Sequence, residues 1–218
     1  MSFTDSLLSR HRGLWARLVE HPFVLRTRDG DMPPEIFNTW LRQDYLFVRE
    51  GRSFLGLLLA RSPERLRDPL ADALAALGEE LDLFRDRAAA LGVDLEDVRP
   101  GLVNHAFVQY LKATAHGASY GSAFTAYWTA EKAYHECWKV VEPGLPADSP
   151  RRPLVENWAG DEFAGFVGWL GSELDALAEQ ASAAEREAME GHFERTARYE
   201  LAFWEMALEG PGWPGLEG

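Results

Sequence analysis

The sequence predicts an all-α protein, a single-domain helical bundle over residues 1–218. Along three long segments, apolar residues recur at alternating steps of three and four positions, which places them on one face of an α-helix. No run of alternating β-branched residues is long enough to indicate a sheet. The length of 218 residues, with 46% hydrophobic residues, suffices for one full hydrophobic core.

Two helices are predicted in the first part of the chain. One runs from about residue 4 to residue 18, with a Thr-Asp pair at its start to cap it, and the His21–Pro22 pair interrupts it. Residues 28–34 form a turn that ends in two prolines, and proline suits the first position of a helix. The second helix therefore begins there and runs to about Arg61.

The next three helices show clear helical periodicity. The third opens near Pro69, carries a leucine-rich heptad pattern and ends at Gly92, because glycine commonly follows the last residue of a helix. The fourth helix occupies roughly residues 101–115, and the fifth occupies roughly residues 119–141.

The proline-rich stretch over residues 142–153 is the longest irregular segment. A linker between two domains at this place would leave the apolar stripes of both halves exposed, so we interpret it as a loop within one domain. Shorter helices within residues 151–180 lead to a long last helix at about residues 183–209, which the Gly210–Pro211 pair ends.

Each of three apolar stripes contains one carboxylate. Asp44 lies in the stripe of the second helix, Glu131 in that of the fifth and Glu200 in that of the last. Burying an ionised carboxylate without a partner costs several kcal/mol, so three such residues indicate a shared polar pocket inside the bundle. The alternative is that each acid is satisfied separately by an arginine or by backbone groups.

Such a pocket suits acid–base chemistry. Glu131 and Glu200 are candidates for an acid–base pair, because burial and a neighbouring carboxylate both favour the protonated form of a carboxyl group. Asp44 is a candidate for gripping the donor edge of a ligand with two oxygens. Phe47, one helical turn further on, offers a ring face beside it.

The net charge of −13 argues against two classes of partner. Nucleic acids and anionic membrane surfaces both require a basic surface on the protein. The longest apolar run is far shorter than a membrane-spanning helix, and no secretory signal is visible at the N-terminus. The single cysteine, Cys137, fits a reducing compartment, so we expect a cytoplasmic protein.

Metal and haem sites are less favoured alternatives. A dimetal carboxylate oxidase needs about four acids and two Glu-x-x-His pairs. The chain offers Glu131 with His135 at a step of four, no second such pair on an apolar stripe, and Glu80 as a candidate fourth acid. The other histidines lie near helix ends or among polar residues, which disfavours a haem ligand. We therefore expect no metal and no cofactor.

Two segments resemble a known family. Residues 28–49, which include Gln43-Asp44-Tyr45, strongly resemble the TenA (thiaminase II) family, and so do residues 199–207, Tyr-Glu-Leu-Ala-Phe-Trp-Glu-Met-Ala. The motifs stand in family order, and the resemblance covers nearly the whole chain from His21 onward. It implies an all-helical haem-oxygenase-like fold that binds no haem.

The resemblance also implies an activity. TenA proteins hydrolyse 4-amino-5-aminomethyl-2-methylpyrimidine to hydroxymethylpyrimidine in thiamin salvage, and some cleave thiamin. The partner would be a small-molecule aminopyrimidine, and family members form homodimers or homotetramers. Matched to the family motifs, Asp44 grips the amino group and ring nitrogen of the pyrimidine, and Glu200 protonates the departing amine.

The chain departs from the larger branch of that family at the catalytic cysteine. The branch has a Cys-x-Trp pattern, whereas this chain reads Ala126-Tyr127-Trp128. Cys137 lies roughly 16 Å further along the helix, too far to substitute. The segment instead resembles the cysteine-lacking, glutamate-type branch, whose members are associated with formylaminopyrimidine and aminopyrimidine. Glu131 is then expected to activate water in place of the cysteine.

Aromatic residues are expected to wall the ligand. The residues expected in the substrate site, besides Asp44, are Phe47, Phe107, Tyr134 and Trp204. Phe47 and Phe107 stand where the family has tyrosines, so two phenolic hydrogen bonds are absent. Asn104 and Tyr110 on the fourth helix are candidate polar replacements.

The sequence leaves the substrate open among aminopyrimidine, formylaminopyrimidine and thiamin. A pyrimidine-binding protein without catalysis is an alternative, because the cysteine and two hydroxyls are absent. A DNA-binding regulator is disfavoured by the net charge of −13.

Overall fold

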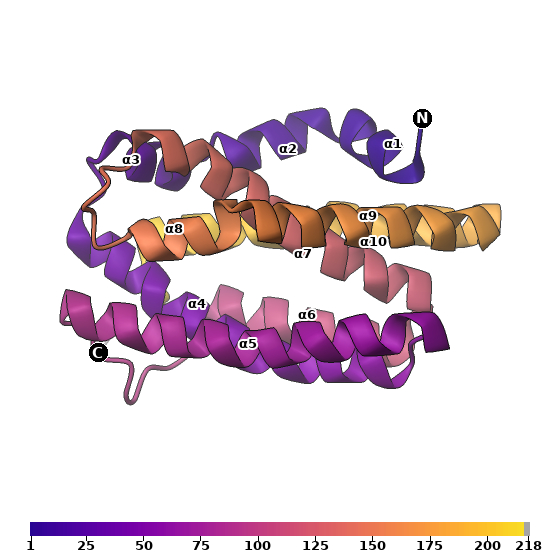
Figure 1. Cartoon of the computed structure of the whole chain (residues 1–218), viewed down its shortest axis with the longest axis horizontal. Helices are drawn as coiled ribbons and strands as arrows, with labels where there is room; N and C mark the ends of the chain where they lie inside the picture. Colours follow the sequence, from indigo (N-terminus) through magenta and orange to yellow (C-terminus); the bar gives the residue numbers. More distant parts are fainter. Residues whose placement is uncertain (216–218) are drawn as a thin grey trace.

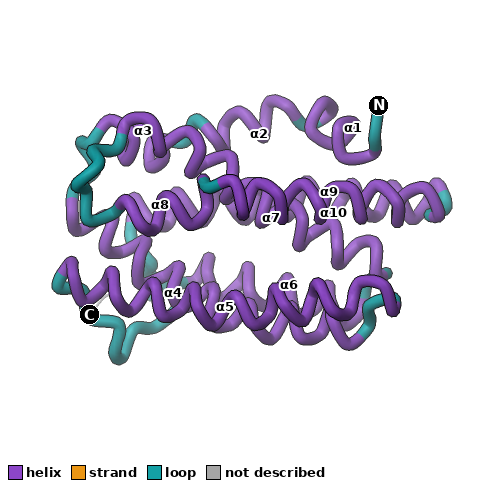
Figure 2. Tube along the Cα trace, in the orientation of Figure 1, coloured by secondary structure: helices purple, strands orange, loops and turns teal. Residues whose placement is uncertain are grey.

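Ten α-helices and one short 3₁₀ helix make up the regular structure of the computed structural model, which describes residues 1–215 (Figures 1 and 2). No strand occurs among these residues, so the predicted all-α class is confirmed. The helices are α1 (Phe3–Arg10), α2 (Arg12–Val19), α3 (Pro22–Asp29), α4 (Pro34–Ala60), α5 (Glu64–Leu91), α6 (Leu102–Gly117), α7 (Tyr120–Val141), η1 (Glu142–Gly144), α8 (Arg152–Ala159), α9 (Asp161–Gln180) and α10 (Ala183–Glu209).

Helix α7 connects the two sides of the molecule, and most of its side chains are buried. It packs against α10, α9, α8 and α3. Helix α4 packs against both α5 and α6, and Figure 1 shows these three helices along the side of the molecule opposite α1, α2 and α3. One continuous hydrophobic core joins the two sides, so the helices form a single domain. Within residues 1–215, none of the helices has the length and apolar character needed to cross a bilayer.

The first predicted helix is in fact two helices, and α3 was not predicted. Helices α1 and α2 are separated at His11, whose backbone (φ −105°, ψ 21°) departs from helical geometry. Helix α3 begins at Pro22, and the ring of His21 caps it by accepting a hydrogen bond of 3.2 Å from the N–H of Phe23. The proline therefore starts a helix instead of only interrupting one, because its fixed φ and missing N–H suit the first helical position.

Helix α5 begins earlier than predicted, at Glu64 instead of near Pro69. A proline inside a helix removes one backbone hydrogen bond. Leu66 and Leu70 on either side of it are 1% and 0% exposed, and their burial keeps the first turn helical. The predicted bounds of α4, α6, α7 and α10 agree with the structure to within about two residues, and the loop after α7 contains only η1.

Gln43 ties α4 to α6 directly beside Asp44. Its side-chain amide donates to the carbonyl of Arg99 (3.0 Å) and accepts from the N–H of Gly101 (2.9 Å). Asn104 on α6 donates to the backbone carbonyl of Gln43 (2.7 Å) and to its side-chain oxygen (3.1 Å). These bonds fix the turn of α4 from which Asp44 projects.

We expect Gln43→Met to lower the free energy of unfolding by about 2–4 kcal/mol. The substitution keeps the side-chain volume but leaves the Gly101 N–H without its acceptor and weakens the bonds of Asn104, and each buried polar group left unpaired costs about 1–3 kcal/mol. Gln109→Met on the exposed face of α6 is the matched control, with an expected change within about 0.5 kcal/mol. Urea unfolding measures both variants, and equal stabilities would contradict this role of Gln43.

Candidate active site

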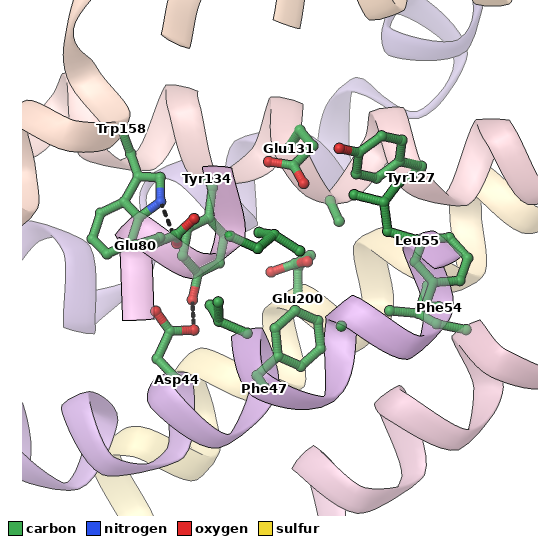
Figure 3. A pocket seen from close by; sticks show the side chains of 15 residues that line it. Asp44, Phe47, Phe54, Leu55, Glu80, Tyr127, Glu131, Tyr134, Trp158 and Glu200 are labelled. Carbon is green, nitrogen blue, oxygen red and sulfur yellow. Dashed lines mark hydrogen bonds between the residues drawn. The ribbon is translucent and has the colours of Figure 1, made fainter. Parts of the chain in front are cut away.

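A cavity lies where α4, α5, α7 and α10 converge (Figure 3). It encloses about 600 Å³ of space not filled by atoms, its opening to solvent included. Trp158 from α8 and Leu111 from α6 complete its wall.

Four carboxyl groups line the cavity, each from a different helix, as Figure 3 shows: Asp44 (α4), Glu80 (α5), Glu131 (α7) and Glu200 (α10). Asp44, Glu131 and Glu200 thus share one cavity, as their places in the apolar stripes predicted. No lysine, arginine or histidine is among the lining residues, all of which belong to the described part of the chain. Acids without a cation suit a ligand that is cationic or rich in hydrogen-bond donors.

Asp44 and Glu200 form the floor of the cavity, because these residues are only 0% and 1% exposed. The hydroxyl of Tyr134 donates a hydrogen bond to Asp44 Oδ1. Asp44 Oδ2 and Glu200 Oε1 have no hydrogen-bond partner among residues 1–215. Since a buried acceptor left unpaired costs about 1–3 kcal/mol, these two oxygens are poised to accept hydrogen bonds from a ligand.

Burial dominates the protonation of all four acids. It raises the pKa of Asp44 and of Glu200 well above the ordinary values, and neighbouring acids raise both further, while the Tyr134 bond partly opposes the rise at Asp44. The pKa of Glu131 rises to about 8, through burial and then through Glu80 and Asp44. The pKa of Glu80 rises only to about 7, because a hydrogen bond from Trp158 opposes the effect of burial.

Sequence reasoning gave no site role to Tyr127 or Trp158 and considered Glu80 only as a metal ligand, yet all three line the cavity. Glu80 falls between Leu77 and Leu81 in the heptad of α5, so its place at the edge of an apolar stripe was a usable signal. Trp158 lies on the short helix α8, and its contact with α5 spans 78 positions of the chain. No local sequence pattern predicts such a contact.

The aromatic residues expected to wall the ligand divide into two layers. Phe47 and Tyr134 line the cavity, whereas Phe107 and Trp204 do not. Phe107 packs behind Phe47, with ring centroids 4.9 Å apart. Trp204 stacks behind Tyr134 at 5.5 Å and 24°. Phe107 and Trp204 thus lie on the core side of the wall residues that they support, and the expected contact of both with a ligand stays a prediction.

Other candidates from the sequence also lie outside the cavity. The hydroxyl of Tyr110 pairs with His192 Nδ1 (2.8 Å), and Asn104 is occupied by Gln43. The thiol of Cys137 is buried against the carbonyl of Leu18, and burial raises its pKa well above the ordinary value. These side chains serve packing and helix pairing in the structure.

A metal site would require ligating side chains grouped around one point. Among residues 1–215, no group of three or more His, Cys, Asp and Glu side chains is arranged to hold a metal ion. His135, considered with Glu131 for a dimetal site, instead directs Nδ1 to the carbonyl of Trp158 at 2.8 Å. The dimetal alternative thus lacks a ligand set in this arrangement.

We expect Glu131→Gln to raise the free energy of unfolding more at pH 8 than at pH 5. With a pKa raised from 4.5 to about 8, folded Glu131 retains a proton that the unfolded chain releases above pH 4.5. Its contribution to stability is therefore lost progressively as the pH rises from about 4.5 to 8, and glutamine removes that loss. With allowance for solvent screening, the gain at pH 8 is on the order of 1–3 kcal/mol.

Urea unfolding at the two pH values measures this difference. Glu179→Gln, on the exposed face of α9, is the control, and its effect should be small and equal at both pH values. A gain from Glu131→Gln that is no larger at pH 8 than at pH 5 would contradict the raised pKa.

Comparisons with known proteins agree with this architecture. The profile of the TENA/THI-4/PQQC family matches residues 8–210. An aminopyrimidine aminohydrolase of Halalkalibacterium halodurans is 30% identical over 222 residues, covering 98% of each chain. A probable bifunctional TENA-E protein of Glycine max is 27% identical over 214 residues, covering 95% of this chain and 93% of that protein.

Solved structures identify the fold. A TenA homologue from Pyrococcus furiosus has a TM-score of 0.90 and 31% sequence identity, covering 94% of this chain and 99% of that one. A domain of unknown function with a heme oxygenase-like fold, from Shewanella denitrificans, has a TM-score of 0.76 at 12% identity, covering 94% and 92%. The haem-oxygenase-like fold implied by the sequence motifs is confirmed. With a family profile that spans most of its length, the chain belongs to the TENA/THI-4/PQQC family.

Proposed function

We propose that the protein is a thiamin-pyrimidine salvage hydrolase, an aminopyrimidine aminohydrolase of the glutamate-type, cysteine-lacking branch. It would convert 4-amino-5-aminomethyl-2-methylpyrimidine and water into hydroxymethylpyrimidine and ammonia. The observation that carries the proposal is a pair of buried oxygens, Asp44 Oδ2 and Glu200 Oε1, which have no hydrogen-bond partner within residues 1–215. They belong to a cavity lined, within the described chain, by four acids and no lysine, arginine or histidine. The similarity to the aminohydrolase of Halalkalibacterium halodurans supports it.

Asp44 binds the pyrimidine in this proposal. The amidine-like edge of the ring offers an amino N–H and a ring nitrogen, one donor and one acceptor. A carboxyl group with a raised pKa can pair with both, by giving its proton to the ring nitrogen. The Tyr134 hydroxyl holds Oδ1 and leaves Oδ2 for the ligand, and Phe47 offers a ring face nearby.

Glu200 is the general acid. Burial, Asp44 and Glu131 together raise its pKa well above the ordinary value, which favours the protonated carboxyl group. A protonated carboxyl group can give its proton to the amine nitrogen as the C–N bond breaks. The fixed acids of the cavity stabilise positive charge that develops on the methylene carbon.

Water takes the place of a cysteine nucleophile. No cysteine is among the residues that line the cavity within the described chain, and Cys137 is held in the core. The two half-buried acids, Glu80 and Glu131, are more accessible than the floor acids, so water reaches them first. The expectation from the sequence assigns water activation to Glu131. The same acids would also serve the N-formyl form of the substrate.

We expect Glu200→Gln to lower kcat by about 10²–10⁴-fold while ligand binding is kept, because only the proton of the general acid is lost. Asp44→Ala should abolish binding of hydroxymethylpyrimidine, because it removes the carboxyl group that pairs with the edge of the ring. Glu205→Gln is the matched control: Glu205 lies on the same helix but bonds His21 Nε2 at 2.9 Å, outside the cavity. Release of ammonia measures turnover, and titration calorimetry with hydroxymethylpyrimidine measures binding.

Parallel assays with aminopyrimidine, its N-formyl form and thiamin identify the substrate. Full activity of Glu200→Gln, or tight binding by Asp44→Ala, would overturn the assigned roles. Binding without any ammonia, formate or thiazole release would favour the alternative of a pyrimidine-binding protein without catalysis. The homodimer or homotetramer expected from the family stays a prediction that light scattering can test.

A further inference from the structure

Glu80 is an acid of the cavity to which the proposed function gives no separate role. It comes from α5, which supplies none of the site residues predicted from the sequence. Its Oε1 accepts a hydrogen bond of 3.1 Å from the indole N–H of Trp158, and Figure 3 shows this pair beside Tyr134. The ring of Tyr134 in turn meets Trp158 edge-on, with centroids 5.7 Å apart. The carboxyl group of Glu80 is thus held at a fixed point of the wall.

We propose that Glu80, in place of the Glu131 expected from the sequence, is the catalytic base that accepts a proton from the attacking water, and that Glu131 is its protonated neighbour. The inference rests on the proposed function, since it names the base of that same reaction. The indole N–H of Trp158 donates a hydrogen bond and never accepts one, so it favours the ionised form of Glu80. No hydrogen bond within residues 1–215 favours the ionised form of Glu131, whose protonation is set by burial and by Glu80 and Asp44.

The position of Glu80 gives it access to water. It is half-buried, whereas Asp44 and Glu200 on the cavity floor are 0% and 1% exposed. Trp158 occupies only Oε1, and Oε2 is not among the buried oxygens that lack a partner within the described residues. No hydrogen bond to Oε2 occurs within residues 1–215, so this oxygen can accept one from water.

The groups around Glu80 favour a state in which only one of the two acids, Glu80 and Glu131, is ionised. The groups that face the cavity with it are Asp44 from α4, Tyr127, Glu131 and Tyr134 from α7, Trp158 from α8 and Glu200 from α10. None of them is cationic, so two ionised acids would repel one another. The pKa of about 7 at Glu80 and of about 8 at Glu131 agree with this order, in which Glu80 loses its proton first.

The reaction balances with these residues in place. The bond between the methylene carbon and the amine nitrogen breaks, its electron pair leaves with nitrogen, and nitrogen takes the proton of Glu200. A water oxygen forms the new bond to the methylene carbon and loses one proton to Glu80. The net change is amine plus water to alcohol plus ammonia, with one proton moved from Glu200 to Glu80. Exchange with solvent then restores both acids.

The first test is Glu80→Gln. Glutamine keeps the volume of the side chain and an oxygen that accepts from Trp158, but it cannot take a proton at neutral pH. We expect kcat for ammonia release to fall by about 10²–10⁴-fold. Binding of hydroxymethylpyrimidine, measured by calorimetry, should stay close to that of the unsubstituted protein, because Asp44 is untouched.

The second test separates the base from a purely structural residue. Trp158→Phe removes the N–H that favours ionised Glu80, so the pKa of the base should rise. The acidic limb of the kcat/KM profile should then move to higher pH, with activity recovered above the limb. Trp138→Phe is the matched control: Trp138 stacks on Trp158 at 5.4 Å, is 1% exposed, and its N–H has no partner in residues 1–215. The acidic limb of the kcat/KM profile of Trp138→Phe should stay at the pH found for the unsubstituted protein.

The outcomes distinguish the two proposals. If the unsubstituted protein binds the aminopyrimidine but releases no ammonia, the proposed function fails and the assignment of a base fails with it. If that protein is active and Glu80→Gln keeps most of its kcat, the role of Glu80 is overturned while the function stands. That role is likewise overturned if the acidic limb of Trp158→Phe stays in place, or if Glu131→Gln alone abolishes that limb.

Discussion

The structure depends on keeping four carboxyl groups in one cavity without a cation to balance them. Asp44, Glu80, Glu131 and Glu200 come from four helices, and within residues 1–215 no lysine, arginine or histidine lines the wall where they meet. In the described part of the chain, two neutral donors form hydrogen bonds with these acids: Tyr134 with Asp44, and Trp158 with Glu80. Since no cation stabilises the charged forms of these acids, burial favours their protonated forms. Burial therefore raises the pKa of each acid.

Aromatic residues support the wall of this cavity from the core side. Trp204 and Phe107 do not touch the cavity but support Tyr134 and Phe47, which do. Such a second layer keeps the wall residues in fixed orientations. Gln43 extends this support to the backbone of α4, since its bonds to α6 hold the turn beside Asp44.

Sequence patterns predicted most of the fold and part of the site for one reason: helical periodicity records which side of a helix is buried. Asp44, Glu131 and Glu200 were found as carboxylates that interrupt an apolar stripe. The break at His11 was missed because neither proline nor glycine, the residues that usually mark the end of a helix, stands at that position. Trp158 was missed because a hydrogen bond between α8 and α5 has no local signature.

The four acids that line the cavity also indicate which ligands it disfavours. A phosphate ester of a pyrimidine or of thiamin carries nearly two negative charges at neutral pH. It would meet four carboxyl groups and no basic side chain among the lining residues of the described chain. In the proposed reaction, the ionised member of the pair Glu80–Glu131 would repel such an ester, and this charge would favour free pyrimidines over phosphorylated ones.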